Sequence, residues 1–162
     1  MIRVAILTVS DGCAAGTRED VSGAKLAEAA RDLGWTVVAT RIVPDEIGGI
    51  LLALEDLSGA DVVLTTGGTG VAPRDVTPEA TRQFSAREVP GLAELMRAEG
   101  RKSTKFAPLS RGIAVTRGST LVVNLPGSPR GALESLQAVS ELVPHVVDLL
   151  HGRTEHSRKP ST

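Results

Sequence analysis

A glycine-rich turn followed by a charged segment between two prolines is the part of this sequence best suited to chemistry. Residues 65–78 read TTGGTGVAPRDVTP. Glycines allow backbone N–H groups to converge on an anion because no Cβ interferes. An apolar run before the turn predicts a buried strand, and the residues after it predict a helix with Thr77 as N-cap and Pro78 at its first position. We therefore predict an anion-binding turn made of Thr66, Gly67, Gly68, Thr69 and Gly70.

This turn differs from the two commonest nucleotide-binding motifs. A P-loop needs a lysine after its last glycine, where this chain has Val71, and the glycines are too closely spaced for a dinucleotide-binding fingerprint. Taken alone, a short glycine motif fits a flexible connection equally well. The segment from Pro73 to Pro78 favours a rigid functional loop, because it fixes the backbone and also carries Arg74 and Asp75.

Two carboxylates, Asp45 and Asp75, are the side chains that we place nearest the chemistry. Carboxylate oxygens on separate loops are what Mg²⁺ prefers, usually together with water and substrate phosphates. Each residue also has a purely structural interpretation. Asp45 is a good N-cap for a helix at residues 47–57. Asp75 is equally suited to pair with Arg74 or to stabilise a turn.

Other polar residues form a second group of candidates. Asp20 either faces a pocket or precedes the N-cap of the next helix, for which we expect Ser22. Ser110 and Arg111 offer a hydroxyl and a guanidinium to a phosphate, although a solvated arginine is the commoner outcome. A rigid turn after a late strand contains Pro126, Gly127 and Ser128. The single cysteine and the three histidines lack metal-ligand or catalytic spacing, and we assign them no role.

The composition narrows the class of protein. A chain of 162 residues with a net charge of −1 predicts one domain and gives no electrostatic reason to bind nucleic acid or a membrane surface. One cysteine excludes an internal disulfide and suits a reducing compartment. No run is long enough to span a membrane and no signal-peptide pattern opens the chain, so we expect a cytoplasmic protein. With only three aromatic residues, a base-stacking surface is not expected.

Alternating strand and helix patterns predict an α/β fold, a doubly wound and mostly parallel sheet with helices on both faces. We expect strands at residues 2–9, 36–43, 61–65, 113–115 and 121–124, the last two forming a hairpin. We expect helices from Ser22, at 47–57, 79–84 and 91–97, and over 132–150 with a break at Pro144. We assign residues 1–152 to one domain and residues 153–162 to a polar tail. Loops that follow parallel strands open toward one edge, which predicts a composite pocket there.

With these loops in view, the chain resembles the molybdopterin adenylyltransferases of the MoaB/Mog family over residues 2–152. The resemblance rests on several stretches in order: LTVSD at 7–11, PDE at 44–46, TTGGTGVAPRDVTPEAT at 65–81, EVPGL at 88–92, LSR at 109–111 and NLPGSP at 124–129. It implies the same doubly wound fold, a homotrimer and a role in molybdenum cofactor biosynthesis. The implied reaction transfers AMP from Mg·ATP to the terminal phosphate of molybdopterin and releases pyrophosphate.

The resemblance also implies roles for particular residues. Asp45 and Asp75 match the essential carboxylates of the family, Gly67–Gly70 its nucleotide-phosphate cradle, and Pro126–Ser128 its pterin-phosphate cradle. A separate molybdenum insertase is an expected downstream partner, and an aliphatic surface on the helix at 91–96 is the expected trimer contact. Two alternatives stay open: a scaffold or carrier that binds molybdopterin with little or no activity, and a nucleotide-derivative hydrolase of the competence-damage type.

Overall fold

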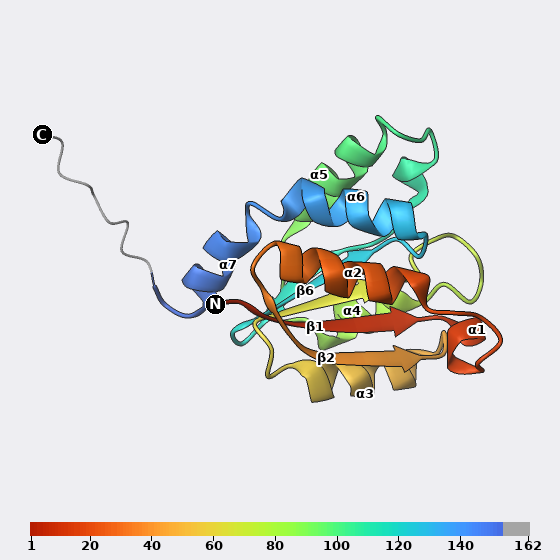
Figure 1. The fold of residues 1–162 in the computed structure, drawn as a ribbon, viewed down its shortest axis with the longest axis horizontal. Coiled ribbons are helices and arrows are strands. Elements are labelled where there is room, and N and C mark those ends of the chain that lie inside the picture. Colours follow the sequence, from red (N-terminus) through yellow and green to blue (C-terminus); the bar gives the residue numbers. More distant parts are fainter. Residues whose placement is uncertain (154–162) are drawn as a thin grey trace, which may run out of the picture.

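The computed structural model describes residues 1–153, and its strands form one six-stranded sheet in the order β2-β1-β3-β6-β5-β4 (Figure 1). The strands are β1 (Arg3–Val9), β2 (Thr36–Val43), β3 (Val62–Thr66), β4 (Arg87–Glu88), β5 (Ala114–Arg117) and β6 (Thr120–Leu125). Strands β2, β1, β3 and β6 are parallel, β5 is antiparallel to β6, and β4 is antiparallel to β5. The predicted fold class and the hairpin are therefore confirmed.

Helices cover both faces of this sheet (Figure 1). They are α1 (Asp11–Ala14), α2 (Val21–Asp32), α3 (Ile47–Leu57), α4 (Thr77–Phe84), α5 (Pro90–Gly100), α6 (Pro129–Val139) and α7 (Val143–Leu150), with a short 3₁₀ helix at Ala107–Leu109. One face carries α2, α5, α6 and α7, and the other carries α3 and α4. The chain breaks between α6 and α7, where Pro144 lies in the first turn of α7, as predicted.

Strand β1 shows why both faces must be covered. Its residues are apolar at successive positions, and side chains alternate between the two faces of a sheet. Val4 and Ile6 accordingly pack in the core beneath α2 and α6, while Ala5 and Leu7 pack in the core against α3. All four are buried. Because its side chains are apolar on both faces of the sheet, β1 lies in the interior of the sheet, covered by helices on both sides.

Several local expectations were wrong, and tertiary contacts explain each. The hydroxyl of Thr77 donates to the carbonyl of Gly67 (2.9 Å) instead of capping α4, whose N-cap is Val76. Asp20 caps α2 in place of Ser22. Strand β4 consists of two residues, both exposed, and forms by pairing with β5. The sequence around it therefore carries no local strand pattern.

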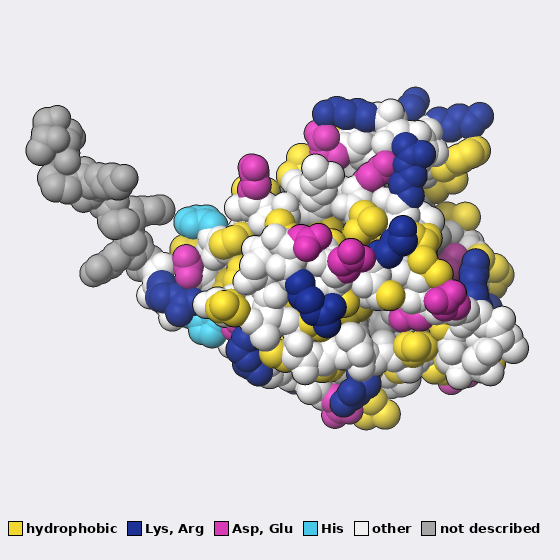
Figure 2. All heavy atoms as spheres, viewed as in Figure 1, with side chains coloured by type: hydrophobic (Ala, Val, Ile, Leu, Met, Phe, Trp, Pro, Cys, Tyr) yellow, Lys and Arg dark blue, Asp and Glu magenta, His cyan; other side chains and the backbone are white. Residues whose placement is uncertain are grey.

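The apolar side chains of α5 do not form an exposed surface. Leu92, Ala93 and Met96 are buried in the core of their own chain, so they supply no exposed aliphatic surface, and the trimer contact stays a prediction. Lysine and arginine side chains gather instead around the end of α5 (Figure 2), where Arg101, Lys102 and Lys105 are exposed.

Within residues 1–153, no helix combines the length and the apolar character needed to cross a membrane.

Candidate active site

The loops that carry the candidate residues meet at one edge of the sheet. Strands β1, β2, β3 and β6 are parallel, so their carboxyl ends lie together, near α1 (Figure 1). Strand β5 runs in the opposite direction, so the residues that precede it reach the same edge. This reversal brings Ser110 and Arg111 beside the glycine-rich turn, where the Arg111 amide donates to the carbonyl of Thr69 (2.8 Å).

Two glycine turns touch each other at this edge. A Cβ added to Gly127 would lie 3.3 Å from the Cα of Gly67, and a Cβ added to Gly67 would lie 2.2 Å from the carbonyl oxygen of Val9. Gly67 also has φ +100°, which side chains disfavour. At Gly67 only glycine allows this approach to the end of β1, and at Gly127 a side chain would make a tight contact with the turn after β3.

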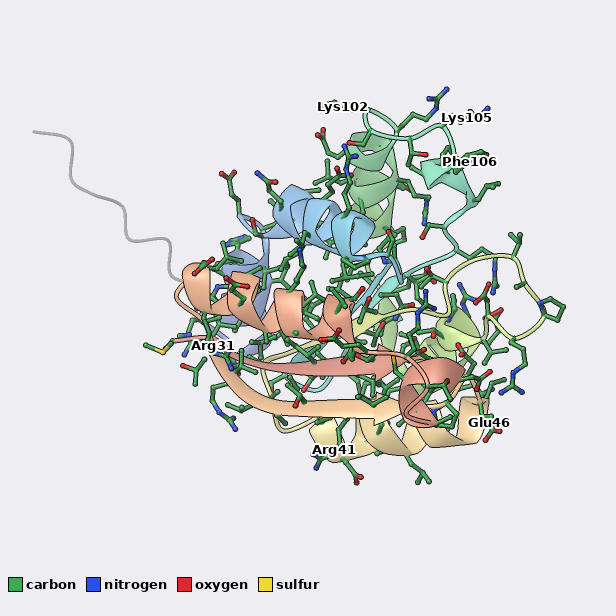
Figure 3. The ribbon with its side chains drawn as sticks, turned by 45° about the vertical axis from the view of Figure 1, so that its right-hand side comes forward. Arg31, Arg41, Glu46, Lys102, Lys105 and Phe106 are labelled. Atoms are coloured by element: carbon green, nitrogen blue, oxygen red, sulfur yellow. The ribbon has the colours of Figure 1, made fainter. Side chains whose placement is uncertain are left out.

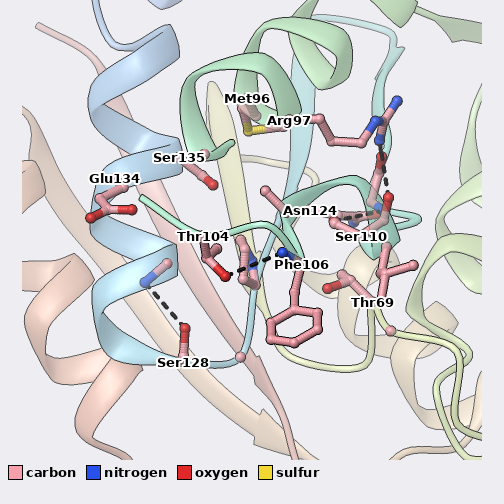
Figure 4. Close-up of a pocket in the computed structure, with 18 of the residues that line it drawn as sticks. Thr69, Met96, Arg97, Thr104, Phe106, Ser110, Asn124, Ser128, Glu134 and Ser135 are labelled. Carbon is pink, nitrogen blue, oxygen red and sulfur yellow. Dashed lines mark hydrogen bonds between the residues drawn. The ribbon is translucent and has the colours of Figure 1, made fainter. Parts of the chain in front are cut away.

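Around these turns lie two adjoining cavities. The first, of about 540 Å³, opens between the loop after β1 and the start of α2, and we call it the α2 cavity. The second, of about 390 Å³, lies between α5 and α6 (Figure 4), and we call it the α5–α6 cavity. Both cavities are lined by Gly68, Asp75, Gly127 and Ser128, so these residues form a shared wall.

The α2 cavity is built to receive an anion. Two helices, α2 and α6, begin at its wall, and Asp20–Ser22 and Ser128–Pro129 line it. Helix N-termini present unpaired N–H groups and a positive dipole end. Within residues 1–153, no backbone hydrogen bond uses the N–H groups of Gly68, Thr69 or Gly70. Gly68 belongs to the shared wall, and Thr69 and Gly70 line the α5–α6 cavity beside it, so these three N–H groups suit an anion bound next to the wall.

The α5–α6 cavity has a more apolar lining. Figure 4 shows Met96 and Arg97 on one side, Glu134 and Ser135 on α6 on the other, and Phe106 between them. Phe106 is 62% exposed, whereas the other phenylalanine, Phe84, is buried. An exposed aromatic ring in an apolar cavity suits a planar organic group.

Asp45 and Asp75 both line the α2 cavity beside the glycine-rich turn. Oδ2 of Asp45 accepts a hydrogen bond from the amide of Asp11 (2.9 Å), and its Oδ1 would lie 3.1 Å from a Cβ added to Gly68. Oδ2 of Asp75 accepts from the amide of Ala72 (3.0 Å). Burial raises the pKa of Asp45, and the charges of Asp11 and Asp75 raise it further, against the Asp11 amide and Arg74, which lower it.

The structural alternatives for these carboxylates are only partly correct. The N-cap of α3 is Glu46, not Asp45. Asp75 does stabilise its turn through Ala72, but Arg74 pairs with Asp11 and not with Asp75. The carboxylate that the sequence did not single out is thus Asp11, whose pKa is held below its usual range by the guanidinium of Arg74.

Arg111 does not offer its guanidinium to a phosphate. Its Nε and NH2 groups donate to the carbonyls of Gly70 and Asp75 (2.7 Å each), and NH1 pairs with Glu79 at the start of α4. Arg111 instead holds the glycine-rich loop in place through its backbone carbonyls.

Most of the predicted hydroxyl groups also hold the loops together. Thr66 donates to the carbonyl of Pro126 (2.7 Å), and Ser22 donates to the carbonyl of Gly127 (2.7 Å). Ser128 caps α6 by accepting from the amide of Gly131 (3.1 Å). Asp20 caps α2 and accepts from the hydroxyl of Thr8 (2.8 Å). These residues line the α2 cavity, as predicted for a site, but their side-chain oxygens already have partners within the protein.

The remaining candidates, Thr69, Gly70 and Ser110, line the α5–α6 cavity. Ser110 Oγ accepts a hydrogen bond from the amide of Gly112 (3.3 Å). The sequence analysis missed the apolar part of this cavity, because Phe106 follows a polar segment without periodicity and lines a cavity whose other residues are distant in sequence.

Comparison with known proteins agrees with this architecture. The family model described as "probable molybdopterin binding domain" matches residues 5–145. The chain belongs to this family. It is 40% identical to the molybdopterin adenylyltransferase of Helicobacter pylori J99 in an alignment of 156 residues that covers 93% of this chain and 89% of that protein. It is 44% identical over 153 residues to the molybdenum cofactor synthesis protein cinnamon of Drosophila melanogaster, covering 92% of this chain but only 26% of cinnamon.

A solved structure supports the same assignment. The crystal structure of MoaB from Thermus thermophilus, described as a molybdopterin biosynthesis enzyme, superposes with a TM-score of 0.87. It is 51% identical in sequence, and the match covers 94% of this chain and 98% of that chain. The fold of this molybdopterin-binding domain is thereby confirmed.

Asp45 and Asp75 fit Mg²⁺ as two of its ligands, with water and substrate phosphates supplying the others. Within residues 1–153, no group of three or more His, Cys, Asp or Glu side chains forms a metal site. Mg²⁺ is usually held by one or two carboxylates together with water and substrate phosphates, and seldom by a cage made only of protein groups. Because Asp45 and Asp75 each use Oδ2 for an internal hydrogen bond, their Oδ1 atoms suit such a site.

We expect Gly67→Ala to destabilise the domain more than Gly118→Ala does. Both glycines have positive φ, but a Cβ on Gly118 meets no atom within 4 Å. The left-handed conformation alone costs a side chain about 1–2 kcal/mol. At Gly67 the Cβ must also displace the backbone of Val9, so the loss in unfolding free energy in urea should exceed that of Gly118→Ala. Equal losses would contradict the close approach of the loops.

We expect Glu79→Gln to lower stability at neutral pH but not in acid. The hydrogen bond from Arg111 lowers the pKa of Glu79 below its ordinary value of 4.5, so its stabilisation is present above that value and is lost as pH falls through the lowered pKa. The pair is partly exposed, so the difference from wild type should be about 1 kcal/mol or less at pH 7. Urea unfolding at about pH 7 and pH 3 measures it. Glu28→Gln, an exposed position on α2, is the control and should show no such pH dependence.

Proposed function

We propose that this chain is a molybdopterin adenylyltransferase of molybdenum cofactor biosynthesis. The reaction transfers AMP from ATP to the terminal phosphate of molybdopterin and releases pyrophosphate. The observation that carries the proposal is the wall shared by the two cavities, because a transfer between two substrates needs two sites whose reacting ends meet. Family membership and the names of its relatives support the same reaction.

The protein's own contribution is to position the two substrates. The free N–H groups of Gly68–Gly70 would hold the phosphates of ATP, and the Pro126–Ser128 turn with the start of α6 would hold the phosphate of molybdopterin. The two turns touch through Gly67 and Gly127, so phosphates bound on them lie side by side. The pterin phosphate is itself the nucleophile, and no covalent enzyme intermediate is needed.

Asp45 and Asp75 would hold Mg²⁺ through their Oδ1 atoms at the edge of this wall. When bound, the ion offsets the negative charge that develops on the transferring group and on pyrophosphate. The fixed donors of the glycine-rich turn stabilise the same charge without reorganisation, because Arg111 and Thr77 hold that turn in place.

Three further properties complete the proposal. From the family resemblance we infer a homotrimer, a cytoplasmic location and delivery of the product to a separate molybdenum insertase. Sedimentation analysis of the purified protein tests the trimer directly, and a monomer at micromolar concentration would contradict it.

Incubation with molybdopterin, Mg²⁺ and labelled ATP tests the reaction itself. We expect pyrophosphate and adenylylated pterin to form in equal amounts, and both to disappear when the metal is removed with a chelator. Tight pterin binding without release of pyrophosphate would contradict the enzyme and would favour a scaffold.

We expect Asp75→Asn to abolish this turnover while leaving the fold intact. An asparagine keeps an oxygen that can accept the hydrogen bond from Ala72, so the loop is preserved while the charge that binds the metal is lost. Asp56→Asn, an exposed position on α3, is the matched control and should keep full activity. Normal turnover by Asp75→Asn would remove this residue from the mechanism.

A further inference from the structure

A chain of hydrogen bonds joins Asp45 to the loop that carries Asp75. The first link is reciprocal: the amide of Asp11 donates to Oδ2 of Asp45 (2.9 Å), and the amide of Asp45 donates to Oδ1 of Asp11 (3.0 Å). The second link is two-pronged: Arg74 donates from Nε to Oδ2 of Asp11 (2.9 Å) and from NH2 to Oδ1 (2.8 Å). We call these four hydrogen bonds the Asp11 clasp.

The clasp connects three loops from different parts of the sequence. Asp11 follows β1, Asp45 follows β2, and Arg74 lies in the loop after β3. Arg74 is the residue directly before Asp75, so a restraint on Arg74 also restrains the second carboxylate. Asp45 follows β2, which is an edge strand of the sheet within residues 1–153.

The clasp also determines which atom of Asp45 is free. Because the Asp11 amide occupies Oδ2, the carboxylate is oriented with Oδ1 toward Gly68 and the shared wall. Arg74 places a positive charge among the acidic side chains of this edge, 4.0 Å from Glu46, which Figure 3 shows at the start of α3. A two-pronged arginine–carboxylate contact fixes geometry in a way that a single charge does not.

We propose that Asp11 and Arg74 are positioning residues that set the distance and orientation between Asp45 and Asp75. They need not touch either substrate. The consequence for Mg²⁺ binding rests on the proposed function, whereas the clasp itself does not. Partners that orient metal-binding side chains typically change metal affinity or activity by about tenfold to hundredfold when they are removed.

The first arm of the test needs neither substrate nor metal. Amide hydrogen exchange at Asp45 is measured by NMR in the wild type, Asp11→Ala, Arg74→Gln and Arg82→Gln. Arg82 is the matched control, since its side chain is 57% exposed against 59% for Arg74 and it pairs with Glu88 away from the site. We expect Asp45 to lose protection in Asp11→Ala and Arg74→Gln only, with unchanged protection of the sheet. Unchanged protection of Asp45 in both would overturn the clasp.

The second arm titrates the rate with Mg²⁺ at saturating ATP and molybdopterin. We expect Arg74→Gln to raise the Mg²⁺ concentration at half-maximal rate about tenfold to hundredfold. Arg74→Lys keeps the charge without the two-pronged contact, and it should lie closer to Arg74→Gln than to the wild type. If Arg74 acted only through its charge, Arg74→Lys would match the wild type and Arg74→Gln would bind Mg²⁺ more tightly, and either result would overturn the proposal.

The two arms separate the failure of this proposal from the failure of the proposed function. A wild type without turnover would contradict the adenylyltransferase, while the exchange arm would still decide whether the clasp exists. Loss of protection at Asp45 together with an unchanged Mg²⁺ requirement in an active Arg74→Gln enzyme would show a clasp without a positioning role, and would overturn the inference.

Discussion

The contact between two glycine turns, Gly67 after β3 and Gly127 after β6, is the constraint on which the site depends. A Cβ on Gly127 would lie only 3.3 Å from the Cα of Gly67, and a Cβ on Gly67 would lie 2.2 Å from the carbonyl oxygen of Val9 at the end of β1. This approach makes the two cavities share a wall, because loops held further apart would leave two separate hollows. The N–H groups of Gly68, Thr69 and Gly70 take part in no backbone hydrogen bond within residues 1–153.

The polar residues around this contact divide into two groups. The larger group holds the loops in place by hydrogen bonds to their backbone carbonyls. Arg111 binds the glycine-rich turn, while Ser22 and Thr66 connect the turn at 126–128 to α2 and β3. The smaller group keeps its binding capacity and consists of backbone N–H groups and one oxygen on each of Asp45 and Asp75. A site of this kind relies on fixed dipoles and two carboxylates, which suits phosphate transfer, where positioning and charge stabilisation are the main requirements.

Local patterns in the sequence predicted every strand except β4, the helices α2 to α7, and the edge at which the loops meet. Strand β2 and helix α3 have the predicted bounds, since apolar periodicity and flanking turns are local signals. The partners of polar side chains were not predictable, because they depend on loops that are distant in sequence. For Arg111 we weighed a phosphate contact against a solvated side chain, and it instead binds the carbonyls of Gly70 and Asp75. Asp11, which we named only within the stretch at 7–11, joins Asp45 to Arg74. The roles of Asp45 and Asp75 in metal binding remain predictions.

A crystal structure with Mg²⁺ and a non-hydrolysable ATP analogue tests the central claim, that the shared wall is where the two substrates react. We predict that a Mg²⁺ ion would be held by the carboxylates of Asp45 and Asp75 together with phosphate oxygens of the analogue. The α-phosphate should lie on the Gly68–Gly70 turn, and the side that the pterin phosphate attacks should face Pro126–Ser128. A triphosphate bound away from the wall that the two cavities share, or a metal ion bound to neither carboxylate, would contradict the account.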